Sequence, residues 1–122
     1  MIAFLFLAAA PLQCPDRVGN QWVINECARR DLRKAESKLD AQWAVTLKAA
    51  AEQDSTNDSY SADTLKTSQQ SWRVYRDAQC RVEAAPIGYM GTLDEYLYIS
   101  CQAAMTEKRI DDLMDIKKAY DQ

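Results

Sequence analysis

One stretch decides the fold of this chain: Cys80-Arg-Val-Glu-Ala-Ala-Pro-Ile-Gly-Tyr-Met-Gly-Thr-Leu-Asp-Glu-Tyr-Leu-Tyr-Ile-Ser-Cys101. Its Pro86, Gly88 and Gly91 end one helix and make a tight connection, because proline and glycine disfavour the interior of a helix. Thr92-Leu-Asp-Glu95 then has the form of a capping box, in which the threonine hydroxyl accepts from the third amide and the glutamate reaches back. The stretch therefore predicts an antiparallel hairpin of two helices.

The two cysteines of this stretch lie at nearly equal distances from the turn. Cys80 lies six residues before Pro86, and Cys101 lies nine residues after Thr92. Antiparallel helices would bring these two side chains level, so we expect a Cys80–Cys101 disulfide, which leaves Cys14 and Cys27 to pair. Four cysteines allow three connectivities, and the sequence alone does not decide among them.

The cysteines also indicate a cellular compartment. An even number of cysteines behind an apolar leader is typical of structural disulfides in secreted or periplasmic proteins. Metal binding and redox chemistry are the alternatives, but the chain has no histidine and no C-x-x-C spacing. We therefore expect no metal and no cofactor. Without histidine or a free thiol the commonest catalytic groups are missing, so we expect no enzyme.

The leader is the uncharged apolar run over residues 1–10. It ends in small residues at Ala8–Ala10, as before a signal-peptide cleavage site, although no lysine or arginine precedes it. Either its charged region is minimal or the true start lies upstream. The run is much shorter than the roughly 20 residues of a membrane-spanning helix. We expect a signal peptide over 1–10 and one domain over 11–122; the alternative is a buried N-terminal segment.

The remaining composition is that of a helical protein. The chain has only three glycines and three prolines, and alanine, leucine, lysine, glutamate and glutamine are abundant. We expect an all-α domain, a small disulfide-stapled bundle of three long helices. The net charge is −3 and no block of lysine and arginine occurs, so we expect no nucleic-acid partner.

The first predicted helix runs from Gln21 to Glu52. Its apolar residues recur every three or four positions and define one face: Ile24, Ala28, Leu32, Ala35, Leu39, Trp43, Leu47 and Ala50. Residues 54–63 are rich in Asp, Ser and Asn, which favour turns, so we expect an exposed loop there.

The second predicted helix begins near Thr64, with Asp63 as its N-cap. Its expected inner positions are Leu65, Ser68, Trp72, Tyr75, Gln79 and Val82. The third predicted helix runs from Thr92 to about Tyr120. Its expected inner positions are Leu93, Leu97, Cys101, Ala104, Ile110, Leu113 and Ile116.

The hairpin register brings polar residues together as well. If Cys80 faces Cys101, Trp72 lies opposite residue 109. Arg109 could then stack on Trp72 or bridge to Asp77 across the helices. For Arg76 and Asp77, which lie beside a packed aromatic residue, a structural network is favoured over direct binding of a partner.

Three blocks of the sequence carry a resemblance to a known family. The first block is Ile24-Asn-Glu-Cys-Ala28, with Asp31 to Ala35 and Leu39 to Trp43. The second block is Gln70-Ser-Trp72-Arg-Val-Tyr75-Arg76-Asp77-Ala-Gln-Cys80. The third block is Cys101-Gln-Ala-Ala-Met-Thr106-Glu-Lys-Arg109, with Leu113. Over residues 14–115 these blocks resemble the LprI-like lysozyme-inhibitor family of bacterial envelope proteins. The second block is the most specific. Asp40, Trp43 and Met105 depart from the residues usual in the family.

The resemblance implies a secreted or periplasmic, disulfide-bonded helical domain that inhibits lysozyme by protein contact. Its motif residues are Trp72, Tyr75, Arg76, Asp77, Thr106 and Arg109. A mildly acidic domain suits a basic lysozyme as partner. The alternative is an interaction or stress-response adaptor of the envelope without affinity for lysozyme.

Two other surfaces are candidates for partner contact. Ile87, Tyr89 and Met90 form an apolar tip at the predicted turn, which either meets a partner or packs back onto the bundle. Asp111, Asp112 and Asp115 form an acidic patch, which is usually a solvated face.

Overall fold

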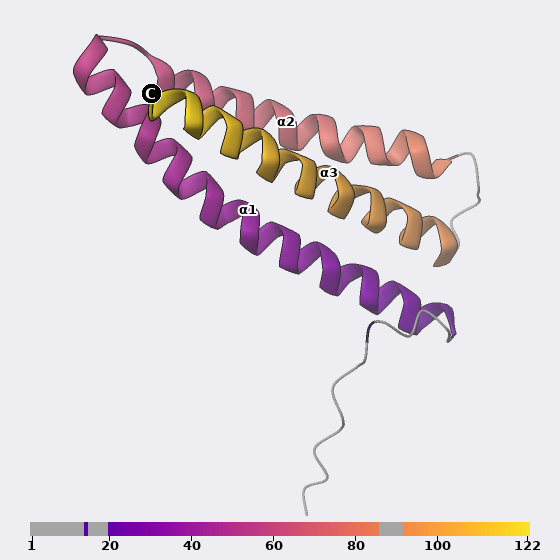
Figure 1. Ribbon diagram of the computed structural model, residues 1–122. Coiled ribbons are helices and arrows are strands. Elements are labelled where there is room, and N and C mark those ends of the chain that lie inside the picture. The colour runs from indigo at the N-terminus through magenta and orange to yellow at the C-terminus, as the bar shows by residue number, and fades with distance from the viewer. Residues whose placement is uncertain (1–13, 15–19, 86–91) are drawn as a thin grey trace, which may run out of the picture.

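The described part of the protein is a bundle of three helices. The computed structural model describes Cys14, residues 20–85 and residues 92–122. Its helices are α1 (Gln21–Asn57), α2 (Ser61–Ala84) and α3 (Thr92–Tyr120), and this described part contains no strand (Figure 1). The all-α prediction is confirmed. The expected signal peptide and the predicted tip at Ile87, Tyr89 and Met90 lie outside the described residues.

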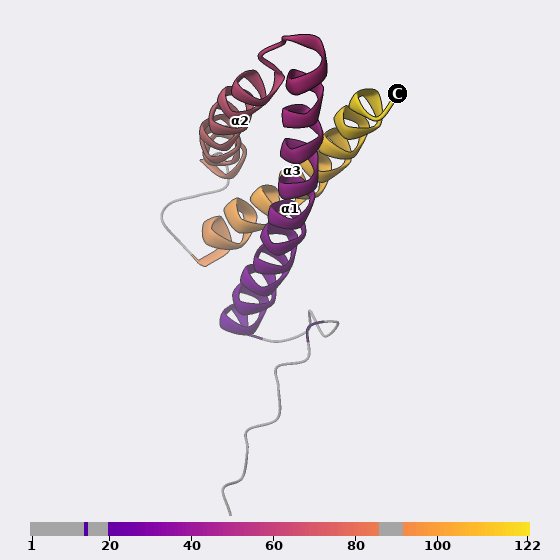
Figure 2. The same cartoon turned by 90° about the vertical axis from the view of Figure 1, so that its left-hand side faces the viewer.

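The longest packing surface lies between α1 and α3. These two helices share more contacts than either shares with α2, and α3 crosses α1 at an angle in the turned view (Figure 2). Contacts between α2 and α3 follow opposite chain order, from Cys80 with Cys101 to Gln69 with Arg109. The two helices therefore run in opposite directions where they meet. No described helix has the length and apolar character needed to cross a membrane.

The core forms where all three helices meet. Leu39 and Ala50 of α1, Leu65 of α2 and Leu113 of α3 are its most buried members. Seven partly buried side chains pack around them: Trp43, Leu47, Ala62, Trp72, Ile110, Ile116 and Tyr120. The face predicted for the first helix is the face that α1 buries.

The inner face predicted for the second helix was correct at Leu65, which is buried, and at Trp72, which packs against the core, but it was wrong at other positions. Tyr75 and Val82 are 58% and 65% exposed, and Ser68 is exposed as well. The buried residues of α2 are Leu65, Gln69, Arg76, Cys80 and Ala84. Because several of these are polar, an apolar periodicity could not locate this face. The buried face of α3 also includes polar residues, namely Gln102, Thr106 and Arg109. Ala104, which was predicted to face inward, is exposed.

The connection between α1 and α2 also differs from the prediction. The expected loop over 54–63 is mostly helical: α1 continues to Asn57, and α2 begins at Ser61 instead of Thr64. Within the short connection over residues 58–60, Asp58 adopts the left-handed conformation, with φ of 50°.

Asp54, and not the predicted Asp63, caps the start of α2. Its carboxylate accepts from the backbone amides of Ser61 (2.7 Å) and Ala62 (3.0 Å) and from the Ser59 hydroxyl (2.6 Å). Tyr60 occupies the N-cap position without a side-chain cap. These hydrogen bonds lower the pKa of Asp54, that from the Ser59 hydroxyl most strongly.

We predict that Asp54→Asn lowers the melting temperature at pH 7, because an amide has one acceptor oxygen where the carboxylate uses two. The pKa of Asp54 is lowered in the folded state, so its stabilising effect is present above the ordinary aspartate pKa of about 3.9 and is lost below the folded pKa. The difference in melting temperature between wild type and variant should therefore shrink as the pH falls from about 5 toward 2.

Thermal unfolding followed by circular dichroism across this pH range is the measurement. Asp63→Asn is the matched control, since Asp63 lies in the first turn of α2 but does not make the cap. A larger loss from Asp63→Asn than from Asp54→Asn would contradict the assignment.

Candidate functional site

Two disulfides frame the bundle. Cys80–Cys101 joins α2 to α3 with a Cα–Cα distance of 5.5 Å, and Cys14–Cys27 ties Cys14 to the first turns of α1 with a Cα–Cα distance of 5.2 Å. These are the pairs that the hairpin argument favours. Cys80, Glu83 and Cys101 are the one group of possible metal ligands within the described ranges. A disulfide-bonded sulfur is not a thiolate, so this group offers a metal only the Glu83 carboxylate.

Trp72 is the centre of a cluster of arginines. The guanidinium carbons of Arg76, Arg109 and Arg73 lie 5.2, 5.7 and 6.0 Å from the centroid of its ring. Cations at such distances are attracted by the negative face of an indole ring. Of the two arrangements predicted for Arg109, the structure shows the contact with Trp72; Asp77 forms its ion pair with Arg76.

Arg76 links all three helices. Its side chain is only 8% exposed, and it pairs with Glu36 of α1, with Asp77 of α2 (2.9 Å) and with the Thr106 hydroxyl of α3 (3.0 Å). Burial by itself lowers the pKa of Arg76, but the hydrogen bonds and charges of Glu36 and Asp77 outweigh it, so the pKa is raised. Arg76 therefore stays charged inside the bundle.

Asp77 connects the same network to α3. One of its oxygens accepts from Arg76 Nε and from Gln102 Nε2, each at 2.9 Å. Burial would raise the pKa of Asp77, yet these hydrogen bonds and the charges of Arg76 and Arg73 lower it. The carboxylate is therefore ionised at neutral pH.

Arg109 is buried and forms no salt bridge with a carboxylate in the described residues, although the charge of Asp112 acts on it. Its Nε donates to Gln69 Oε1 (2.9 Å), and its Nη2 donates to the Ser68 hydroxyl (3.1 Å). Burial lowers the pKa of Arg109, which is nevertheless an arginine and remains protonated. The neutral amide of Gln69 is thereby fixed in position.

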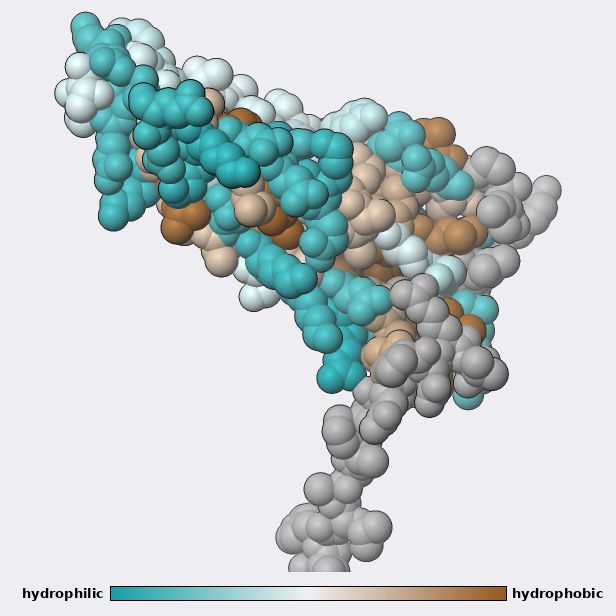
Figure 3. Space-filling view, in the orientation of Figure 1, coloured by the Kyte–Doolittle hydropathy of each residue, from teal (hydrophilic) through white to brown (hydrophobic). Residues whose placement is uncertain are grey.

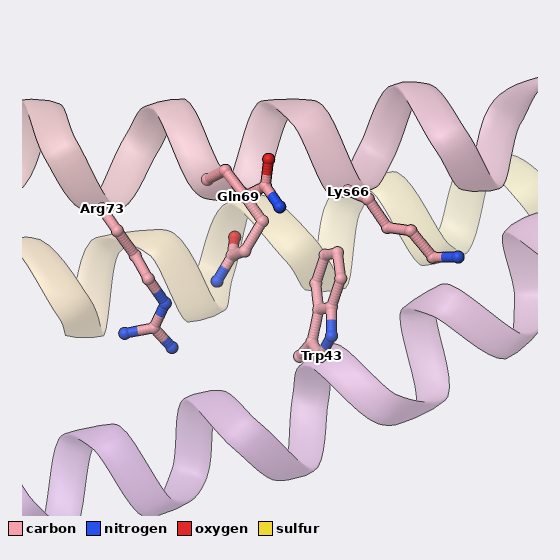
Figure 4. Close-up of a pocket in the computed structure, with 5 residues that line it drawn as sticks. Trp43, Lys66, Gln69 and Arg73 are labelled. Carbon is pink, nitrogen blue, oxygen red and sulfur yellow. The ribbon is translucent and has the colours of Figure 1, made fainter.

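A pocket of about 250 Å³ opens beside this network. It is lined by Trp43 of α1 and by Lys66, Gln69, Gln70 and Arg73 of α2 (Figure 4). Gln69 Nε2 is buried at the pocket and has no hydrogen-bond partner in the described structure. An unsatisfied buried donor costs about 1–3 kcal/mol, so this atom is unusual.

The structure brings together most of the residues that the sequence singled out. Five members of the motif meet in one network: Trp72, Arg76, Asp77, Thr106 and Arg109. Tyr75 does not join it, because its side chain points away from the bundle and is 58% exposed.

Sequence reasoning missed three members of the network, Glu36, Gln69 and Gln102. One signal could have found Gln69. It lies 7 and 11 residues before Arg76 and Cys80, on the same helical face as the half-cystine. Glu36 and Gln102 gave no such signal, because their partners come from another helix.

Comparison with known proteins places this chain in a family. The family described as "Lysozyme inhibitor LprI" matches residues 14–113, most of the chain. An uncharacterized protein of Rhizobium meliloti (strain 1021) is 27% identical over 106 residues, which cover 82% of this chain and 76% of the relative. No solved structure matches the chain significantly. The matched region contains both disulfides and the whole arginine–tryptophan network, and the chain therefore belongs to the LprI lysozyme-inhibitor family.

Proposed function

We propose that this protein acts outside the cytoplasm and inhibits a lysozyme, or a related cell-wall hydrolase, by binding it directly. The observation that carries the proposal is the family match over residues 14–113. Two disulfides in a small domain fit a periplasmic or secreted protein. An inhibitor family is also consistent with a protein that has no enzymatic activity of its own.

A rigid scaffold supports this role. The disulfides and the Arg76 network fix the three helices to one another before any partner arrives. Binding then orders few additional groups, which reduces the entropic cost of association. This feature suits a protein whose task is to block another protein's active site.

The charge distribution supports a basic partner. The net charge is −3, and Asp111 and Asp115 lie one turn apart along an exposed edge of α3, next to Glu107, which pairs with Lys38 at 3.6 Å. Figure 3 shows strongly hydrophilic surface over the C-terminal part of α3, where Lys117 and Lys118 lie near these carboxylates. A net negative charge with exposed carboxylates at Asp111 and Asp115 speeds association with a basic lysozyme, and salt weakens the effect.

The outward face of α2 is the contact surface we propose. Val74, Tyr75 and Val82 are 73%, 58% and 65% exposed, and with the exposed Ala78 they span about 100° of the helix. Single exposed apolar residues are ordinary, whereas several around one tyrosine match the composition of the centre of an interface. Among the family motif residues of α2, which are Trp72, Tyr75, Arg76, Asp77 and Cys80, Tyr75 is the most exposed.

The test is lysis of a cell-wall suspension by a basic lysozyme, with the oxidised protein titrated in at low and moderate salt. We expect inhibition that saturates near one inhibitor per enzyme and weakens as salt rises. A folded, oxidised protein that inhibits none of several lysozyme types would overturn the proposal. The envelope adaptor without lysozyme affinity would then be the better hypothesis.

Tyr75→Ala is predicted to weaken inhibition by tenfold or more while leaving the melting temperature unchanged, because truncation of a central aromatic residue typically removes a large share of binding energy. Tyr60→Ala is the matched control: Tyr60 is 79% exposed and lies at the junction of α1 and α2. Equal effects of the two changes on inhibition would place the contact elsewhere.

A further inference from the structure

We propose that the two disulfides differ in reactivity: a dithiol reductant opens Cys14–Cys27 in the folded protein, whereas Cys80–Cys101 resists it. This exchange site is separate from the outward face of α2 and goes beyond lysozyme inhibition. Both bridges lie toward the end of the bundle where α1 and α3 begin and α2 ends (Figure 1). Each bridge joins a buried cysteine, Cys27 or Cys80, to a half-buried one, Cys14 or Cys101. Burial therefore does not distinguish the two bridges.

The first argument is a cation at Cys14–Cys27. The Arg30 guanidinium donates from Nη1 to Cys14 Sγ at 3.7 Å. A neighbouring arginine stabilises a thiolate, and a stabilised thiolate is the better leaving group in thiol–disulfide exchange. Arg30 also attracts the anionic thiolate of a reductant toward this bridge. No described carboxylate, Asp31 included, lies within 4.8 Å of both sulfurs of Cys14–Cys27.

The second argument is an anion at Cys80–Cys101. The Glu83 carboxylate lies 2.8 Å from Cys101 Sγ, and the group that it forms with the two sulfurs spans no more than 4.8 Å. Its other oxygen accepts from the neutral amide of Gln79 at 3.4 Å, which leaves the negative charge in place. This charge repels an approaching thiolate and destabilises the thiolate that Cys101 would become. Glu83 therefore opposes reduction of the bridge that joins α2 to α3.

The exchange itself proceeds in two displacements. A thiolate of the reductant attacks the half-buried Cys14 Sγ, a mixed disulfide forms, and Cys27 leaves as a thiolate. The second thiol of the reductant loses its proton and attacks the first sulfur of the reductant, and Cys14 then leaves as a thiolate beside Arg30. Two electrons pass from the dithiol, which becomes a disulfide, to the protein. The two thiol protons of the dithiol go to Cys27 and to the solvent.

The half-reduced protein keeps the contacts that hold its helices together. Cys14–Cys27 ties Cys14 only to the first turns of α1, whereas Cys80–Cys101 joins two separate helices. The links from Arg76 to Glu36 and to Thr106 are also unaffected by opening of Cys14–Cys27. We therefore expect a folded bundle that carries two free thiols where α1 begins.

The experiment uses the whole oxidised protein and dithiothreitol. Samples are taken during reduction near neutral pH and low salt, their thiols are capped with iodoacetamide, and the capped cysteines are located by mass spectrometry of peptides. We expect a species capped only at Cys14 and Cys27 to form first. Cys80–Cys101 should open more slowly by about tenfold or more, because the two neighbouring charges are opposite in sign. Circular dichroism of the first species should retain the helical signal of the oxidised protein.

Variants test the charges separately. Arg30→Gln should slow the opening of Cys14–Cys27 severalfold, and Arg30→Lys, which keeps the charge, should slow it less. Lys48→Gln removes the same unit charge about 27 Å farther along α1 and should leave the rate unaltered. Glu83→Gln should speed the opening of Cys80–Cys101 severalfold, whereas Glu52→Gln, an exposed change near the far end of α1, should not.

Three results would overturn the proposal. The first is that Cys80–Cys101 opens before Cys14–Cys27 or at the same rate. The second is that Cys14–Cys27 opens first but neither Arg30→Gln nor Glu83→Gln changes a rate, since local unfolding and not charge would then set the order. The third is that the species capped at Cys14 and Cys27 has lost its helical signal. None of these readouts depends on lysozyme.

Discussion

Replacement of both Cys80 and Cys101 by serine is expected to lower the free energy of unfolding by about 3 kcal/mol. The disulfide joins residues 21 positions apart, and without it the unfolded chain gains the entropy that loop closure removes. It also ties α2 to α3, which share far fewer contacts than α1 and α3. For a domain of this size, 1 kcal/mol corresponds to about 4–8 °C, so the melting temperature should fall by roughly 12–24 °C.

Denaturant unfolding and thermal melts of the oxidised proteins measure this loss. The double replacement avoids leaving an unpaired thiol that could form new disulfides. Reduction of the wild type is the control, and it should destabilise at least as much, because it opens Cys14–Cys27 too. An unchanged melting temperature of the double variant under oxidising conditions would show that this bridge does not stabilise the fold.

Glu36→Gln is expected to lower the free energy of unfolding by roughly 2–3 kcal/mol, because it removes a charged partner from a buried guanidinium. Glu36 pairs with Arg76, whose side chain is 8% exposed, and also with Arg73 at 3.3 Å. Without the Glu36 carboxylate, Asp77 is the remaining ion-pair partner of Arg76, and Arg109 is a second buried arginine nearby. The measurement is denaturant unfolding at pH 7 and low salt.

Asp40→Asn is a closely matched control. Asp40 lies one turn beyond Glu36 on α1, also near Arg73, but at 3.8 Å and with a side chain that is 73% exposed. An exposed ion pair contributes about 0–1 kcal/mol, so this change should have little effect. If Glu36→Gln and Asp40→Asn lower the free energy of unfolding equally, the pairing of Glu36 with the buried Arg76 does not explain the stabilising effect of Glu36.

The Cys80–Cys101 disulfide and the Glu36–Arg76 pair both attach α2 to the rest of the bundle. Arg76 and Cys80 lie one turn apart on the buried face of α2, and both hold this helix to its neighbours. Apolar packing on this face is sparse, since Gln69 and Arg76 occupy positions that a hydrophobic side chain would fill in most helices. Covalent and polar contacts therefore carry much of the attachment of α2.

Local signals were enough to determine several features. The scarcity of glycine and proline gave an all-α protein, and Pro86, Gly88 and Gly91 separated the last two helices. The start of α3 at Thr92 and its end at Tyr120 were predicted correctly. The apolar face of α1 was also correct, because it carries alanine and leucine at regular helical spacing.

Only the tertiary structure decided how the polar residues are used. The buried face of α2, the cap that Asp54 gives to Ser61, and the pairing of Glu36 with Arg76 all join residues that local patterns treat separately. A polar side chain can be buried when a distant partner satisfies it, and hydrophobic periodicity contains no information about that partner. The sequence by itself therefore determined the three-helix fold and the family of this protein, whereas packing determined which face of α2 turns inward and which faces outward.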